Sequence, residues 1–124
     1  MDIRRTRLDK MSFPVITETY FSGTSGYRIW SPDTNGYKYC EQWGRATPAQ
    51  NNNGTIDVTL LKEYINTNGI CLVSSADVTF MSGGGINYGT SSAKFINTKT
   101  IRVKTATVSN EEKYKQWFTG GYIA

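Results

Sequence analysis

The chain has 124 residues, a mass of 13.9 kDa, a net charge of +4 and a mean hydropathy of −0.45. This length fits one domain with a modest core, and no apolar run approaches the roughly 20 residues that a membrane-spanning helix needs. The sequence contains no histidine, which removes the commonest general base and the group that usually orients serine or cysteine nucleophiles.

Two cysteines, Cys40 and Cys71, are too few for a structural zinc site, which takes four Cys or His ligands. We therefore expect no metal and no cofactor. Cytoplasmic thiols stay reduced, and free cysteine is among the most buried residue types. We expect two buried free thiols, with a disulfide between them as the alternative.

Catalysis would have to rely on carboxylates, because a glycoside hydrolase needs only two of them facing each other at about 5 to 9 Å. The carboxylates within the predicted domain include Asp33, Glu41, Asp57, Glu63, Asp77, Glu111 and Glu112. They are scattered over predicted turns and strand faces, where solvated surface charge is the simpler interpretation. We therefore expect no enzymatic activity.

The chain opens with a basic arm, residues 1–12, which is the first of two predicted units. The cations of the arm are Arg4, Arg5, Arg7 and Lys10. No apolar segment follows them, so the arm is not a secretory signal peptide and we expect synthesis in a cytoplasm. The arm is either a frayed terminus or a segment that becomes ordered when it docks onto another protein.

Residues 13–124 form the second unit and carry β signals almost throughout. Runs of β-branched and aromatic residues separated by turn residues are typical of strands. Outside the hairpin described below, strands are predicted at residues 15–21, 55–60, 70–73, 76–81, 93–96, 100–108 and 117–123. Loops or turns are predicted at residues 23–26, 48–54, 68–69 and 82–85.

Three segments carry more specific expectations. The continuous apolar run at residues 70–73 predicts a central strand buried on both faces. Residues 61–66 give mixed signals, and the run is too short to define a helix. The side chains at helical spacing are Leu60, Leu61, Tyr64 and Ile65. Residues 111–115 predict a helical turn capped by Asn110.

The most informative stretch is residues 27–45, in which two aromatic-rich runs flank a turn. Asn35 and Gly36 tolerate positive φ and predict a tight turn, so the flanking runs should pair as antiparallel strands. Alternation along the second run places four side chains on one face, namely Tyr37, Tyr39, Glu41 and Trp43. We expect Trp30 and Trp43 on opposite sides of this hairpin, with at least one of them buried in the core.

Short strands at a spacing of 8 to 12 residues, with Gly and Asn turns and no long amphipathic helix, favour an all-β fold. The predicted fold is a small antiparallel β-sandwich, jelly-roll-like, formed as a single domain after the N-terminal arm.

The hairpin also has a familiar residue order. Tyr-x-x-Trp-Ser, an Asn-Gly turn and then Tyr-x-Tyr-Cys-Glu-Gln-Trp-Gly-Arg resembles the opening hairpin of the C-terminal, knob-like domains of bacteriophage tail-fibre and related virion-fibre proteins. Residues 117–124 resemble the short Trp-containing strand, ending in a Gly, that closes those domains. Residues 32–35 make the turn longer here than the family pattern.

The resemblance implies a structural virion protein, a small tail-fibre or head-fibre module that serves particle assembly and host-surface attachment by binding. Such modules are typically homotrimers, and the basic arm would contact other virion proteins. A host-surface glycan or protein would be contacted by loop residues, namely Asn51, Asn52, Asn53, Asn87 and Tyr88. The implied location is the virion, assembled in the host cytoplasm, without membrane insertion.

A sequence pI near 9.1 and the many aromatic residues leave a single-stranded nucleic-acid-binding β-barrel as the alternative. Such proteins interleave Lys or Arg with aromatic residues on one strand face. Here Glu41 is predicted to share a face with Tyr39 and Trp43. We therefore favour the fibre module over the nucleic-acid binder.

Overall fold

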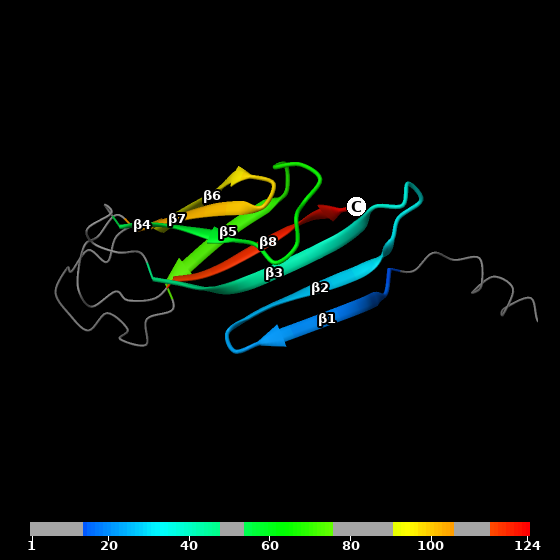
Figure 1. Ribbon diagram of the computed structural model, residues 1–124, viewed down its shortest axis with the longest axis horizontal. Coiled ribbons are helices and arrows are strands. Elements are labelled where there is room, and N and C mark those ends of the chain that lie inside the picture. The colour runs from blue at the N-terminus through cyan, green and yellow to red at the C-terminus, as the bar shows by residue number, and fades with distance from the viewer. Residues whose placement is uncertain (1–13, 48–53, 76–90, 106–114) are drawn as a thin grey trace, which may run out of the picture.

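The computed structural model describes residues 14–47, 54–75, 91–105 and 115–124. These ranges contain eight strands and no helix (Figure 1). The strands are β1 (Ile16–Ser22), β2 (Ser25–Pro32), β3 (Lys38–Ala46), β4 (Thr55–Thr59), β5 (Ile70–Ser75), β6 (Ser91–Asn97), β7 (Thr100–Thr105) and β8 (Lys115–Ile123). Within the same ranges, no helix is long and apolar enough to cross a membrane.

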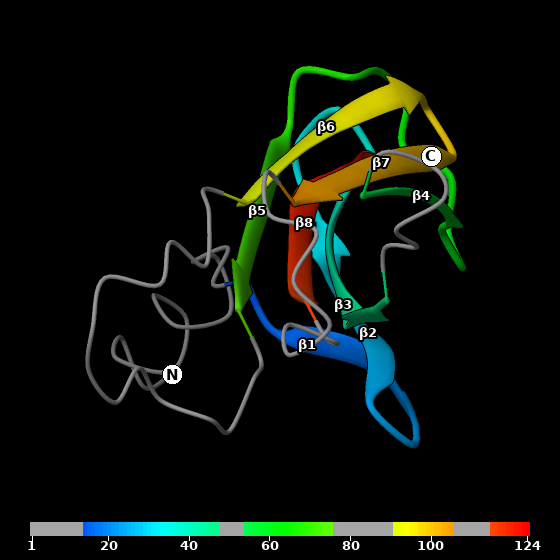
Figure 2. The same ribbon diagram turned by 90° about the vertical axis from the view of Figure 1, so that its left-hand side faces the viewer.

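The strands form two antiparallel sheets, which confirms the predicted small β-sandwich. The large sheet has the order β1-β2-β3-β8-β5, and the small sheet has the order β4-β7-β6. In Figures 1 and 2 the small sheet lies beside the β5 and β8 side of the large sheet, and β1 lies at the far edge. All seven residues of β1 are exposed.

The core lies between the two sheets. Ile101 and Val103 of β7 are completely buried and belong to one apolar cluster with Cys40 and Trp117 of the large sheet. These residues follow the predicted alternation, because strand side chains point to the two faces in turn. Burial of this inward-facing set is the main stabilising contribution to the sandwich.

The connector between β4 and β5, residues 60–69, contains no helix and is held by hydrogen bonds to the large sheet and to the turn between β6 and β7. The buried Gln42 side chain donates to the Lys62 carbonyl and accepts from the Lys62 N–H, both at 2.9 Å. The Tyr64 hydroxyl shares a 2.7 Å hydrogen bond with Thr119 Oγ1 and donates to the Cys40 carbonyl at 3.2 Å. The helical spacing of residues 60–65 therefore reflects two inward side chains, Leu60 and Tyr64, of an irregular segment.

The expectation of a buried central strand at residues 70–73 is wrong. β5 is an edge strand of the large sheet, and the Leu72 side chain is 59% exposed. Both faces of β5 are apolar for different reasons. The Val73 side chain packs against the core, whereas Leu72 lies on the outer face of the sheet opposite Phe118. The predicted loop at residues 23–26 is also too long, since Gly23 and Thr24 alone form the turn between β1 and β2.

Both cysteines are free thiols, as expected, but only Cys40 is fully buried and Cys71 is half-buried. Burial raises the pKa of the Cys40 thiol to about 12 and that of Cys71 to about 11. Both thiols therefore stay protonated at neutral pH.

Two predicted segments lie outside the described residues. They are the strand at residues 76–81 and the helical turn at residues 111–115 with its capping residue Asn110, of which only residue 115 is described.

Candidate functional site

The outer face of the large sheet, opposite the core, carries most of the chain's described aromatic side chains. Cross-strand register builds it, with Arg28 opposite Glu41, Trp43 opposite Phe118 and Tyr39 opposite Tyr122. Directly opposed residues lie on the same face of a sheet. This confirms the predicted common face for Tyr39, Glu41 and Trp43.

Trp30 lies on this same outer face. The expectation that the Trp30 and Trp43 side chains lie on opposite sides of the hairpin is therefore wrong. Trp30 Nε1 donates a 2.7 Å hydrogen bond to Glu41 Oε1. Ordinary alternation along β2 places Trp30 on the outer face, because Arg28, two residues earlier, is opposite the outward Glu41. Trp30 and Trp43 are both half-buried, and the tryptophan in the core is Trp117.

One end of the outer face carries an apolar band, which we define as Phe21, Trp43, Phe118 and Leu72 of β1, β3, β8 and β5. The Phe21 and Trp43 ring centroids lie 5.4 Å apart, and Leu72 is opposite Phe118. Phe21 is 64% exposed. Gly26 lets the Trp43 ring lie flat, because a Cβ there would come within 2.9 Å of it. The band is a contiguous apolar surface across the sheet.

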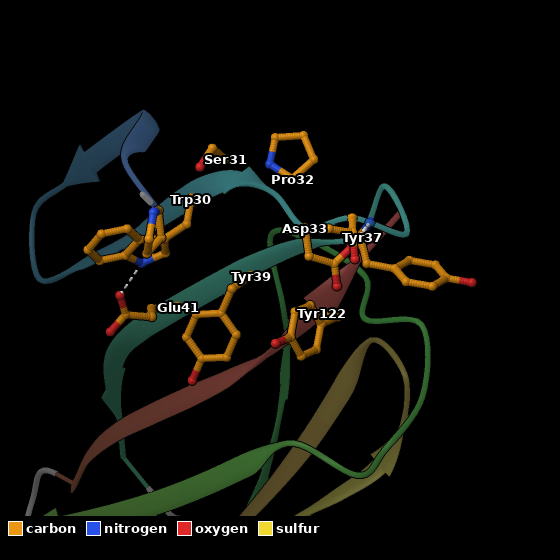
Figure 3. Close-up of a pocket in the computed structure, with 10 residues that line it drawn as sticks. Trp30, Ser31, Pro32, Asp33, Tyr37, Tyr39, Glu41 and Tyr122 are labelled. Carbon is orange, nitrogen blue, oxygen red and sulfur yellow. Dashed lines mark hydrogen bonds between the residues drawn. The ribbon is translucent and has the colours of Figure 1, made fainter. Parts of the chain in front are cut away.

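The other end of the outer face holds a cavity of about 650 Å³, which we call the tyrosine pocket (Figure 3). Its aromatic lining residues are Trp30, Tyr37, Tyr39 and Tyr122, and its carboxylates are Asp33 and Glu41. The remaining lining residues are Pro14, Ser31, Pro32 and Thr34. Among the described lining residues the charged side chains are these two carboxylates, and none is Lys or Arg.

The turn between β2 and β3 positions one rim of the pocket. Asp33 Oδ1 accepts hydrogen bonds from the backbone N–H groups of Asn35 at 2.8 Å and Tyr37 at 3.0 Å. Gly36 has φ of 86°, a conformation that favours glycine. The predicted Asn35-Gly36 turn is therefore present, and the Asp33 side chain closes it.

The floor of the pocket is formed by Tyr39 and Tyr122, whose ring centroids lie 5.5 Å apart at an interplanar angle of 71°. A Cβ at Gly120 would meet the Tyr39 hydroxyl, so the glycine leaves room for the ring. Burial, and secondarily the Glu41 carboxylate, raises the pKa of Tyr39. The Tyr39 hydroxyl thus remains a hydrogen-bond donor at neutral pH.

Three described cations lie on the outer face of the small sheet. Lys94, Arg102 and Lys104 line a hollow of about 430 Å³ there. Arg102 donates to both carboxylate oxygens of Asp57, at 2.7 and 3.0 Å, and this contact holds the pKa of Asp57 below its usual range. The aromatic face of the large sheet also carries a cation, because the Arg28 guanidinium lies 5.7 Å from the Trp43 ring centroid.

The residues predicted from the sequence to bind a receptor or a virion partner lie outside the described residues. They are Asn51, Asn52, Asn53, Asn87 and Tyr88 in loops, and Arg4, Arg5, Arg7 and Lys10 in the arm. Sequence reasoning singled out the hairpin aromatics but did not predict a pocket. The missing information was the pairing of β3 with β8, which brings Tyr122 beside Tyr39.

In the described ranges no three Cys, Asp or Glu side chains are grouped so that they could hold a metal ion.

Two solved structures share this fold. One is an N-truncated R2-type pyocin tail fibre, and the other is a C-terminal fragment of a P. aeruginosa R2 pyocin fibre. Each matches 94% of this chain with a TM-score of 0.53 and 17% sequence identity. This chain spans 41% of the first and 28% of the second. The fold is therefore tail-fibre-like. No protein-family model and no curated protein matches the chain.

Proposed function

We propose that this chain is a structural fibre module of a bacteriophage or phage-like particle, of the knob-like class, and that it acts by binding. The likeness of nearly its whole length to two tail-fibre structures is the observation that carries this proposal. The two segments that resemble virion fibres in sequence, the hairpin and the closing strand, are also physical neighbours. β3 pairs with β8 along its full length, from Lys38 opposite Ile123 to Ala46 opposite Lys115.

The proposed role involves no catalysis. Asp33 and Glu41 are the two carboxylates that line the tyrosine pocket, and both already accept hydrogen bonds from the protein. Glu41 orients Trp30, and Asp33 closes the turn. These contacts support a role for both carboxylates in the architecture of the pocket.

The proposed assembly is a homotrimer. The apolar band presents Phe21 and Leu72 to solvent in the single chain, and β1 leaves one edge unpaired. Exposed strand edges and contiguous apolar patches are surfaces that proteins usually cover. A threefold contact through the band would leave the tyrosine pocket, at the opposite end of the face, open.

Particle docking is proposed for the basic arm, residues 1–12, and receptor contact for the predicted loop residues. A short basic segment can become ordered on a partner surface, which would anchor the module while the β domain stays free. Host-surface attachment, to a glycan or a protein, is the proposed purpose.

The nucleic-acid alternative is not supported by the charge distribution. A stacking platform for single strands needs cations along its aromatic face. The outer face of the large sheet has one such contact, between Arg28 and the Trp43 ring. The charged side chains among the described lining residues of the tyrosine pocket are carboxylates, and the hollow that contains Arg102 has no aromatic side chain among its described lining residues.

Co-sedimentation with particles tests the fibre proposal. In cells that produce the phage or phage-like particle to which this module is proposed to belong, the full chain should sediment with purified particles. A variant that lacks residues 1–10 should fold normally but remain in the soluble fraction. A matched variant with Gln at Arg4, Arg5, Arg7 and Lys10 separates the effect of charge from that of length.

Each outcome has a distinct meaning. Absence of the full chain from particles would contradict the fibre proposal itself. Incorporation of the arm-less variant at parental levels would overturn only the anchoring role of the arm.

A further inference from the structure

The tyrosine pocket has the dimensions of a small-ligand site. Its volume of about 650 Å³ falls in the range of roughly 300 to 1,000 Å³ that such sites occupy. It also combines aromatic and proline side chains with a few converging polar groups, which is the usual composition of a ligand site. The apolar band, by contrast, is a surface suited to another protein.

The arrangement of rings favours an extended ligand. Figure 3 shows Trp30, Tyr39 and Tyr122 in a row along the outer face rather than around a single point. A cage for one ammonium group would place several ring faces within about 6 Å of one cation. A row of rings instead offers successive apolar surfaces to a chain of linked units.

The polar groups match a ligand rich in hydroxyls. Tyrosine, serine and threonine hydroxyls both donate and accept hydrogen bonds, whereas the carboxylates only accept them. Tyr122, Ser31 and Thr34 bring hydroxyl groups to the lining, interspersed with the aromatic rings. A pyranose presents the complementary surface, since its C–H groups pack on aromatic rings while its hydroxyls bond at the rim.

The charge of the pocket restricts the kind of saccharide. The charged side chains among the described lining residues are the carboxylates of Asp33 and Glu41, so an acidic sugar would bring like charges together beside them. Juxtaposed like charges oppose association. An uncharged saccharide meets no such repulsion.

The lining is also held in place before any ligand arrives. The Trp30 hydrogen bond to Glu41 fixes the indole, and the Asp33 hydrogen bonds fix the turn that carries Tyr37. Pre-ordered side chains lower the entropic cost of binding.

We propose that the tyrosine pocket is a subsite for an uncharged oligosaccharide, bound by stacking on Trp30, Tyr39 and Tyr122. This inference rests on the attachment role proposed above and gives that role a location and a ligand class.

Titration of the full chain with defined trisaccharides tests the inference. The neutral probes are cellotriose, maltotriose and triacetylchitotriose, and the acidic probe is trigalacturonate. Tetramethylammonium tests for a cation cage. At millimolar concentration, at least one neutral probe should bind, as followed by tryptophan fluorescence and calorimetry, and trigalacturonate should not.

Variants locate the binding. Tyr122→Ala should weaken binding of the neutral probe by about tenfold or more, and Tyr122→Phe should retain most of the affinity because it keeps the ring. Tyr20→Ala is the matched control, since Tyr20 is also an exposed tyrosine of the large sheet but stacks on Tyr27, outside the pocket. Glu41→Gln should retain neutral binding and weaken the exclusion of trigalacturonate.

The inference is overturned if no neutral probe binds, if binding is equally sensitive to Tyr20→Ala and Tyr122→Ala, or if tetramethylammonium binds in the pocket in preference to every sugar. Particle co-sedimentation stays independent of these results. If the chain sediments with particles but binds no neutral sugar, the result contradicts this inference alone. If the chain binds a neutral sugar but is absent from particles, the result contradicts the fibre proposal.

Discussion

At the scale of single residues, glycines decide where the large aromatic rings lie. Gly44 of β3 is opposite Trp117 of β8, and a Cβ on Gly44 would lie 2.6 Å from the Trp117 ring. Gly26 similarly accommodates Trp43 on the outer face. The distribution of the three tryptophans therefore depends on which strands face each other, which residue order along one strand does not reveal.

The Gly44 and Trp117 contact gives a stability prediction. Gly44→Ala should lower the free energy of unfolding by about 1 to 3 kcal/mol, because the added methyl group overpacks a filled core. In a Trp117→Phe background the same change should cost clearly less, because the smaller ring leaves room. Urea unfolding of the four proteins in this cycle measures the coupling.

The control for this cycle is Thr47→Ala, at an exposed position just after β3, which should change stability by less than about 0.5 kcal/mol. Equal effects of Gly44→Ala in both backgrounds would show that the ring is not the obstacle.

At the scale of elements, the connector at residues 60–69 shows how one buried polar side chain can organise a segment without regular structure. Gln42 is completely buried and bonds to both backbone groups of Lys62, much as a neighbouring strand would. Tyr64 then caps the sheet by covering Gly121, where a Cβ would lie 3.0 Å from its ring. A buried glutamine in a predicted strand gave no sequence signal about which segment it would bind.

Gln42→Leu should therefore destabilise the protein by about 1 to 3 kcal/mol, since it leaves the Lys62 N–H and carbonyl without their partner. Gln116→Leu, an exposed position on β8, should have little effect. Hydrogen exchange at the amide of Lys62 should accelerate in the first variant only. Unchanged exchange there in Gln42→Leu would contradict the role given to this side chain.

The strands themselves were largely predictable, because alternation and turn residues act locally. Residues 15–21, 55–60 and 117–123 correspond to β1, β4 and β8. The position of residues 70–73 was not predictable in the same way. An apolar run looks the same whether a strand is buried on both faces or lies at an edge beside an apolar outer face.

At the scale of the whole molecule, the sandwich is asymmetric. The small sheet lies beside β5 and β8, whereas no described strand forms a layer over β1, whose residues are all exposed (Figures 1 and 2). One outer face thus holds two functional candidates, the apolar band at one end and the tyrosine pocket at the other. The aromatic content of the hairpin predicted an unusual surface, but its division into these two parts depends on register across all five strands.

The proposed threefold fibre module is tested most directly by its mass in solution. Multi-angle light scattering at micromolar concentration should give three times the 13.9 kDa of one chain. Replacing Phe21 and Leu72 together with Ser should lower that mass without loss of cooperative unfolding, whereas Leu61→Ser, at an exposed position on the connector, should leave the trimer intact. A parent chain that is stably monomeric under these conditions would contradict the threefold module.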